Sequence, residues 1–325
     1  MAYDLDKIEL GHGSGGLMMQ DLLENLFFKA YGRCEDDAAV CDGIAFSTDS
    51  YVVSPKFFPG GDIGKLAVCG TVNDVSTRGC PQFLSISIIL EQGYEISKLK
   101  TITKSINDAA IEAGVKIVTG DTKVVEKGCV DGIFINTAGI GKGNPNLSGK
   151  NCIPGDKILV SGTLGDHGMA IMANRMNIET SLKSDVAPLN NLVQDVLKAA
   201  PHTRTFRDPT RGGLASTLNE FAQQSNVDIK IDENKIPVKK EVQSVCDILG
   251  FDVLQVANEG KMVAIVPDNE AEAALVAMKK NKYGIDAAII GECLEPTTNK
   301  VVVETQYKTK RILDMLAGSQ LPRIC

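Results

Sequence analysis

Five short acidic segments place carboxylates in turn-like contexts beside apolar, strand-like stretches. Carboxylates at strand ends can converge on one hard cation, and Mg²⁺ carrying nucleotide phosphates is the usual occupant of such a site. Each segment also has a simpler interpretation, because Asp favours turns and helix caps. Five segments in one chain shift the balance modestly towards a metal site; their carboxylates are Asp36 and Asp37, Asp49, Asp74, Asp121 and Asp208.

A glycine-rich run, Gly11-His-Gly-Ser-Gly-Gly, precedes an apolar-periodic stretch at 17–30 that predicts a helix. Backbone amides in such a run can approach an anion, and a helix N-terminus favours negative charge. The run is neither a Walker-type phosphate loop nor a G-x-G-x-x-G motif. It therefore predicts either a flexible leader or a cover over phosphates.

Three further side chains are candidates for handling protons or phosphate. Lys123 follows Gly-Asp-Thr, and Glu259 lies in Asn-Glu-Gly before a strand. Loop residues on a rigid scaffold often transfer protons, although a solvated Lys and a turn Glu are the commoner outcome. His167, in Gly-Asp-His-Gly, either contacts phosphate or caps the helix that begins there.

Cys325 differs from the other cysteines because it is the last residue of the sequence. A thiol behind Gly318, Ser319 and Pro322 could swing and take a covalently attached group from one site to another. Arg323 would favour the thiolate, and the terminal carboxylate would oppose it. The alternative is an incidental free thiol.

Composition narrows the function classes. The 325 residues include 34 Lys plus Arg and 41 Asp plus Glu, for a formal charge of −7, so a nucleic-acid binder is not expected. We expect no membrane span and no signal peptide. Nine cysteines without a C-x-x-C pair, beside three histidines, argue against structural zinc or disulfides and favour a cytosolic protein with reduced thiols.

The apolar pattern predicts a mixed α+β protein of two domains. In the first half we expect helices at 63–78 and 96–113, and strands at 83–90, 115–119 and 133–140. The Gly-, Pro- and Asn-rich stretch 141–155 marks the boundary. Strands and helices alternate again beyond it, and the segment after residue 316 reads as a loose tail.

Taken together, the motifs resemble the HypE family of nickel–iron hydrogenase maturation proteins, within the AIR synthetase (PurM-like) superfamily. The resemblance runs from near residue 10 to the last residue. The terminal Pro-Arg-Ile-Cys is its most specific part. The matching segments are His12-Gly-Ser-Gly-Gly, Asp36-Asp-Ala-Ala-Val, Phe57-Phe-Pro-Gly-Gly-Asp-Ile-Gly, Gly70-Thr-Val-Asn-Asp, Gly120-Asp-Thr-Lys-Val-Val, Gly165-Asp-His-Gly, Asp208-Pro-Thr-Arg-Gly-Gly-Leu, Asn258-Glu-Gly and Pro322-Arg-Ile-Cys.

The resemblance implies a PurM-like α+β fold. Residues 1–145 would form an ATP-binding and dimerisation domain that pairs with its copy to build a β-barrel-like core. Residues 150–316 would form a C-terminal α+β domain, and 317–325 a flexible tail carrying the terminal Cys.

The resemblance also implies a set of site residues. Mg²⁺ would be bound by Asp37, Asp49, Asp74, Asp121 and Asp208, with Asp36 as a substitute for Asp37. Catalytic roles would fall to Cys325, Glu259 as first choice for the base, and Lys123 as its helper. The nucleotide-binding residues would be His12, Gly13, Gly15, Gly16, Asp36, Asp37, Asp49, Asn73, Asp74, Asp121, Thr122 and Asp208.

The implied activity is ATP-dependent dehydration of a carbamoyl group on Cys325 to a thiocyanate, with ATP and Mg²⁺ as cofactors. The implied partners are a second copy of the chain, a HypF-like carbamoyltransferase that loads the thiol, and a HypC–HypD complex that accepts cyanide, all in the cytoplasm. Two alternatives remain: a superfamily kinase for selenide or thiamine phosphate that does not need Cys325, and a non-catalytic nucleotide-binding scaffold.

Overall fold

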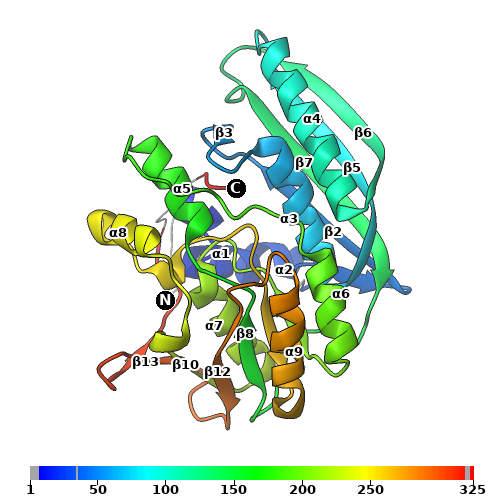
Figure 1. Cartoon of the computed structure of the whole chain (residues 1–325). Helices are drawn as coiled ribbons and strands as arrows, with labels where there is room; N and C mark the ends of the chain where they lie inside the picture. Colours follow the sequence, from blue (N-terminus) through cyan, green and yellow to red (C-terminus); the bar gives the residue numbers. More distant parts are fainter. Residues whose placement is uncertain (1–6, 34–35, 319–322) are drawn as a thin grey trace.

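A computed structural model describes residues 7–33, 36–318 and 323–325 of the chain. Two β-sheets dominate the fold, one in each half of the sequence, and helices pack on their faces (Figure 1). Within these described ranges, no helix is long and apolar enough to cross a membrane. The expected mixed α+β architecture is confirmed.

The N-terminal sheet has the strand order β1-β2-β7-β5-β6. Neighbours run antiparallel except β5 and β6, which are parallel and joined by the crossover helix α4 (Ile96–Ala113). A small hairpin of β3 (Phe57–Phe58) and β4 (Gly61–Asp62) precedes helix α3 (Ile63–Arg78). The strands are β1 (Ala39–Cys41), β2 (Ile44–Tyr51), β5 (Gly79–Glu91), β6 (Lys116–Val125) and β7 (Ile133–Gly143).

Helix α3 is the buried centre of the molecule. The Asp62 carboxylate caps its N-terminus by accepting bonds from the backbone N–H groups of Gly64 and Lys65, at 2.8 and 3.0 Å. Its apolar residues surround the whole helix because the helix packs on β2 and β7 on one side and on β9 and α6 of the second half on the other. The polar side chains of Thr71, Asn73, Ser76 and Thr77 on α3 are therefore buried.

The C-terminal sheet has the order β14-β13-β10-β12-β8-β11-β9. The sheet face that carries the Ile158 side chain packs on α7 (Gly213–Ser225). The opposite face, which carries Leu159, packs on α6 (Asn190–Ala199) and α9 (Asp268–Lys280). The strands are β8 (Lys157–Val160), β9 (Thr205–Arg207), β10 (Asp228–Asp232), β11 (Val263–Val266), β12 (Ala288–Leu294), β13 (Val301–Glu304) and β14 (Lys310–Ile312). The other helical elements are α5 (Asp166–Arg175), η3 (Glu233–Lys235), α8 (Lys240–Leu249) and η4 (Val253–Gln255).

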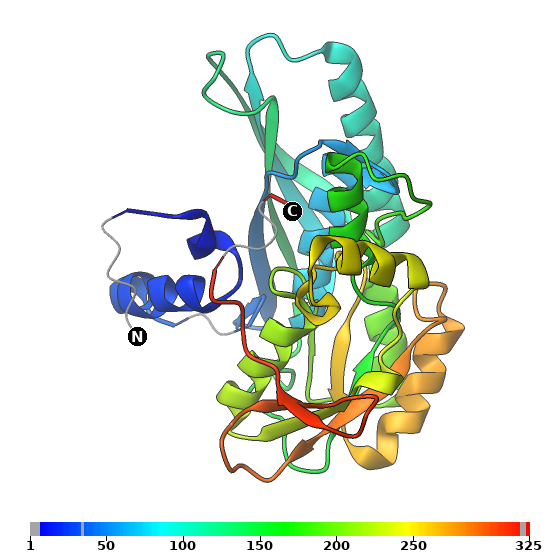
Figure 2. The same ribbon diagram turned by 90° about the vertical axis from the view of Figure 1, so that its left-hand side faces the viewer.

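The leader lies beside α7 and projects from the body (Figure 2). It consists of η1 (Leu10–Gly13), α1 (Leu17–Leu22), the π-helical turn η2 (Leu23–Phe27) and α2 (Phe28–Tyr31), so the helix expected at 17–30 is interrupted. Leu17 N–H donates to the Leu316 carbonyl at 2.8 Å, which ties the leader to the end of the second half.

The last three residues lie against the chain that follows β2. Backbone N–H groups of Val52 and Ser54 donate to the carbonyls of Cys325 and Arg323, at 3.0 and 3.1 Å. Ile324 is only 3% exposed and belongs to the core around α3. A loose tail was expected, but these residues are docked between the two halves; Ser319 and Pro322 lie outside the described residues.

Candidate active site

Four carboxylates from distant parts of the sequence face one region between the halves, and we call them the acidic cluster: Asp37, Asp49, Asp74 and Asp208. Asp37 precedes β1, Asp49 lies on β2, Asp74 on α3, and Asp208 directly after β9. Ser47 ties two of them together, because its hydroxyl lies 3.0 Å from the Asp74 carboxylate and 2.9 Å from the Asp37 carbonyl.

Arg207 and Arg211 offset the negative charge of the acidic cluster only in part, since the pKa values of its carboxylates are still raised. Burial raises the pKa of Asp74 well above its ordinary value, and repulsion from Asp208, Asp37 and Asp49 raises it further. Burial likewise raises the pKa of Asp208, with Asp37 and Asp49 adding to it and Arg207 opposing it. Such a group of neighbouring, partly buried carboxylates favours a bound cation.

The fit to Mg²⁺ is supported by one atom in particular. Asp37 Oδ2 is buried and, within the described part of the chain, has no hydrogen-bond partner, while Oδ1 lies 3.3 Å from Arg207 Nε. In the same ranges, no three His, Cys, Asp or Glu side chains converge tightly enough to hold a metal by themselves. The carboxylates therefore suit a Mg²⁺ that brings phosphate ligands with it.

Asp36 plays a different role from Asp37, although both border the same cavity. Its carboxylate pairs with Arg78 and accepts bonds from Ser148 Oγ at 3.1 Å and Gly149 N–H at 3.0 Å. These contacts fasten the segment before β1 to the linker between the halves. Asp36 also lines the cavity, and a role for it in nucleotide binding or as a substitute for Asp37 stays a prediction.

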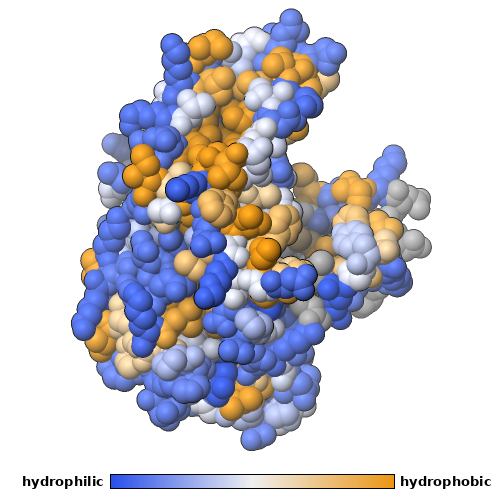
Figure 3. Space-filling view, turned by 90° about the vertical axis from the view of Figure 1, so that its right-hand side faces the viewer, coloured by the Kyte–Doolittle hydropathy of each residue, from blue (hydrophilic) through white to orange (hydrophobic). Residues whose placement is uncertain are grey.

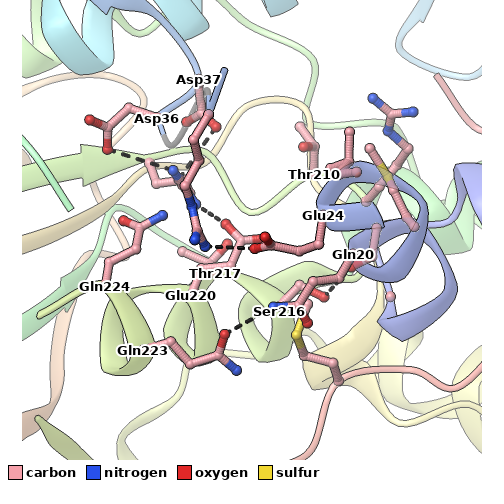
Figure 4. Close-up of a pocket in the computed structure, with 18 of the residues that line it drawn as sticks. Gln20, Glu24, Asp36, Asp37, Thr210, Ser216, Thr217, Glu220, Gln223 and Gln224 are labelled. Carbon is pink, nitrogen blue, oxygen red and sulfur yellow. Dashed lines mark hydrogen bonds and ion pairs between the residues drawn. The ribbon is translucent and has the colours of Figure 1, made fainter. Parts of the chain in front are cut away.

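A cavity of about 470 Å³ opens beside the acidic cluster, between the leader and α7. Figure 4 shows Gln20 and Glu24 of the leader on one side and Glu220 and Gln223 of α7 on the other. Gln20 Nε2 donates to Gln223 Oε1 at 3.0 Å, and Arg211 lines the cavity near the cluster. The volume and the cationic groups beside carboxylates suit a nucleotide with its metal.

The glycine run covers this cavity from one side. Gly15 has φ of +74°, and a Cβ there would lie 2.4 Å from the Arg211 carbonyl oxygen. A Cβ on Gly16 would lie 2.2 Å from the Leu316 carbonyl oxygen. Gly15 and Gly16 line the cavity, whereas His12 bonds to Glu9 and, with Gly13, lies outside the lining. Gly13 contributes only its carbonyl, 3.4 Å from Arg211 Nη1.

Glu259 and the Cys325 thiol are near enough to the acidic cluster, and to each other, to interact electrostatically. Glu259 is 2% exposed, and its Oε1 has no hydrogen-bond partner among the described residues. Burial raises its pKa well above the ordinary value, with Asp208 and Asp49 adding to the rise. Burial raises the pKa of the Cys325 thiol to about 12, while the nearby Arg211 opposes the rise.

Asn73 stands beside these groups but does not face the cavity. Its Nδ2 donates to the Ala187 carbonyl at 3.1 Å, and its Oδ1 accepts from Leu189 N–H at 2.8 Å. Asn73 therefore fixes the chain before α6 to α3, and its expected role in nucleotide binding stays a prediction. Burial in a fixed helix explains these bonds, since the amide satisfies backbone groups of the second half.

Three predicted residues lie apart from the site. Asp121, Thr122 and Lys123 are exposed residues of β6, the edge strand of the N-terminal sheet. Lys123 Nζ pairs with Asp121 Oδ2 at 2.5 Å. Their register partners are Ser87, Ile88 and Ile89 of β5, and none of the three lines the cavity beside the acidic cluster. A single chain does not bring Asp121 into the acidic cluster or Lys123 to Cys325.

Two residues that sequence reasoning misjudged complete the site. His167 does not cap α5, whose N-cap is Gly165; it is buried, and its Nε2 lies 2.6 Å from the Ile324 carbonyl oxygen of the docked tail. Arg211 was quoted only as part of the Asp208 motif, yet it lies between the cavity and the Cys325 thiol. Its position three residues after Asp208 was the available signal.

Comparisons with known proteins agree with this geometry. Residues 35–142 match the AIR synthase related protein N-terminal domain, and residues 154–304 match the corresponding C-terminal domain. Carbamoyl dehydratase HypE from Bradyrhizobium diazoefficiens is 49% identical, over 98% of this chain and 96% of its own length.

Two solved structures are also similar. A HypE–HypF complex contains a chain of 50% identity, with a TM-score of 0.87 over 91% of this chain and 99% of that one. Hydrogenase maturation protein HypE in complex with ATP is 45% identical, with a TM-score of 0.85 over 97% of this chain and 98% of that one.

Proposed function

The chain belongs to the HypE family of carbamoyl dehydratases, and we propose that it uses ATP to dehydrate a carbamoyl group carried on its own Cys325. The observation that carries this proposal is the position of the tail. The terminal thiol is docked beside Arg211 and Glu259, at the edge of the acidic cluster. A thiol held there has no role in a kinase that acts on a free metabolite.

ATP would occupy the cavity between the leader and α7, with its phosphates directed at the acidic cluster. A similar protein has been solved with ATP, which supports the assignment. Asp37, Asp49, Asp74 and Asp208 would hold Mg²⁺, whose charge would offset that of the phosphates. Arg211, between the cavity and Cys325, would place positive charge where the terminal phosphate meets the loaded tail.

The carbamoyl group on Cys325 would become a thiocyanate in two stages. Its amide oxygen attacks the γ-phosphorus of ATP, ADP leaves, and one N–H proton is lost. The second N–H proton then leaves, the C–O bond breaks, and phosphate departs with the former amide oxygen. In sum, S-carbamoyl-cysteine and ATP give S-cyano-cysteine, ADP, phosphate and one proton.

Glu259 is our choice for the base that removes a nitrogen proton. Its free Oε1 and its burial next to the docked thiol give it access to the amide. Its raised pKa makes it a stronger base than an exposed carboxylate, and docking of the loaded tail would exclude water from the site.

A second copy of the chain would complete the site. The face of the N-terminal sheet opposite α3 exposes Phe46, Ile140 and Phe83, which are direct neighbours across three strands. Figure 3 shows hydrophobic side chains gathered on the upper half of the molecule, where this sheet lies. Such an unpartnered apolar face favours an isologous dimer.

Dimerisation gives a role to the residues that one chain leaves apart. Asp121 and Lys123 are in register with Ser87 and Ile89 on the exposed face of the sheet. We infer that each copy places them at the edge of its partner's site, where Asp121 would add a ligand for Mg²⁺ and Lys123 would help deprotonate the amide.

The partners follow from the chemistry of the tail. A HypF-like carbamoyltransferase would load Cys325, consistent with the solved complex of a similar HypE with HypF. A HypC–HypD complex would then take the cyano group for the iron of a nickel–iron hydrogenase. We place these exchanges in the cytoplasm.

ATP consumption by the loaded chain tests the proposal. Potassium cyanate carbamoylates thiols chemically, so Cys325 can be loaded without a partner protein. We expect carbamoylation to start one round of Mg-ATP hydrolysis per tail in the wild type and none in Cys325→Ala. Turnover of selenide or thiamine phosphate by Cys325→Ala would instead favour a superfamily kinase, and bound but unconsumed ATP would favour a scaffold.

A further inference from the structure

His167 contacts the tail rather than the nucleotide, and its hydrogen bonds define its tautomer. Ser184 Oγ accepts a bond from Val186 N–H at 3.1 Å and lies 2.8 Å from His167 Nδ1. The hydroxyl proton is then free to point at Nδ1, which leaves the ring proton on Nε2. That Nε2–H donates to the Ile324 carbonyl at 2.6 Å.

The ring is held rigidly in this orientation. His167 is fully buried, and the Phe58 ring packs against it edge-on with centroids 5.6 Å apart. Burial lowers the pKa of His167, so the ring stays neutral and keeps one acceptor and one donor. Ser184 and Phe58 thus hold the donor in the direction of the Ile324 carbonyl.

Arg175, at the other end of α5, makes the second contact. Its Nε donates to the Ser54 carbonyl at 2.5 Å, and its Nη2 donates to the Arg323 carbonyl. The guanidinium therefore bridges the tail to the strand-like segment at residues 52–54 against which it lies. His167 and Arg175 together bind two successive carbonyls of the tail, and neither contacts the Cys325 side chain in these bonds.

We propose that His167 and Arg175 act as a tail latch: positioning residues that set how much of the time the tail is docked. The proposal rests on the proposed function, in which Cys325 must be docked for dehydration and released for loading and delivery. Because the described bonds of the latch to residues 323–325 go to backbone carbonyls, it would hold the free thiol, the carbamoyl form and the cyano form in the same pose.

Alkylation of Cys325 measures the docked fraction directly. The docked thiol is half-buried and desolvation raises its pKa to about 12, whereas a released thiol reacts as an ordinary cysteine. Iodoacetamide labelling is followed by mass spectrometry of the peptide spanning residues 305–325, released by cleavage after Glu304. That peptide contains Cys325 as its single cysteine, so the eight other thiols do not interfere.

We expect His167→Leu and Arg175→Met each to speed this alkylation about five- to tenfold, as loss of one net hydrogen bond predicts. His167→Gln retains an amide donor near the Nε2 position and should restore slow labelling. Met169→Ala is the matched control, because Met169 is buried on the same helix but packs in a different cluster from Ile324. It should label at the wild-type rate.

Two outcomes overturn the latch. One is wild-type labelling in both His167→Leu and Arg175→Met; the other is equal acceleration in Met169→Ala, which would make the effect one of helix stability. Labelling is done without ATP or a carbamoyl group, so it can disprove the latch without bearing on whether the chain dehydrates a carbamoyl group. With loaded tails, latch variants should lower kcat for dehydration by a similar factor while the KM for ATP is unchanged.

Discussion

The acidic cluster and the tail latch face the same space but are built in opposite ways. Carboxylates of the cluster repel one another, and Asp37 Oδ2 has no hydrogen-bond partner in the described chain. The latch has both ring nitrogens of His167 bound and the Arg175 guanidinium shared between two carbonyls. The acidic cluster leaves charge and a hydrogen-bond acceptor that an incoming charged ligand would satisfy. In the tail latch, the chain's own tail already satisfies the hydrogen-bond donors.

The largest effect should come from the cluster itself. We expect Asp208→Asn to lower dehydration by about three orders of magnitude, because it removes a Mg²⁺ ligand and charge stabilisation of the phosphoryl group. The same change relieves repulsion, so the unliganded variant should melt at a higher temperature than the wild type. Single-turnover assays and thermal melts measure the two effects; unchanged dehydration would contradict a catalytic role for the cluster.

Glu259→Gln should lower dehydration by about two orders of magnitude while leaving ATP binding intact, since it removes a base rather than a metal ligand. In the wild type, kcat/KM should rise as the pH passes through the raised pKa of Glu259, because the carboxyl then loses its proton. This rising part of the pH profile should be absent in Glu259→Gln. If kcat/KM of Glu259→Gln rises with pH as it does in the wild type, another residue is the base.

Mixing two inactive variants tests whether each site spans two copies. If Asp208 and Asp121 serve a site from different chains, a heterodimer of Asp208→Asn and Asp121→Asn has one intact site. Statistical exchange of subunits should then restore about a quarter of wild-type activity. No recovery, despite subunit exchange confirmed by native mass spectrometry, would show that Asp121 does not act in the partner's site.

The smallest effect is on stability as a function of pH. The pKa values of Asp74 and Asp208 in the folded protein are well above the ordinary 3.8. Proton binding by these two carboxyls therefore stabilises the fold fully below pH 3.8, and this stabilisation is lost as the pH rises through the raised pKa values. The melting temperature of the unliganded protein should fall by a few degrees over that window. Mg-ATP or Asp74→Asn should flatten the slope, whereas His167→Gln should leave it unchanged.

Local patterns indicated the elements of the first half, and the four carboxylates of the acidic cluster belong to the set that the resemblance implied for Mg²⁺, whose binding stays a prediction. The helix at 63–78 is found with those bounds, because Asp62 caps it and Gly79 ends it. Sequence did not separate Asp36 from Asp37: adjacent residues point to different partners, and Arg78 and Gly149, which bind Asp36, are remote in sequence.

Contacts between distant segments account for the other differences. His167 and Ile324 are separated by 157 residues, so no local motif could indicate their hydrogen bond. Asp121 and Lys123 match the family motif, but their place on an edge strand shows only when the sheet is assembled. Asn73 was assigned by its motif to the nucleotide, whereas packing of α3 against the second half decides its bonds.

The most direct test of the account follows the carbamoyl oxygen. Cys325 is loaded with cyanate containing a heavy oxygen isotope, Mg-ATP is added, and the peptide 305–325 and the released phosphate are analysed by mass spectrometry. We predict that the peptide loses one water only with ATP and that the heavy oxygen appears in phosphate. An unchanged carbamoyl adduct despite ATP hydrolysis, or a heavy oxygen found in water, would contradict dehydration through a phosphorylated amide on Cys325.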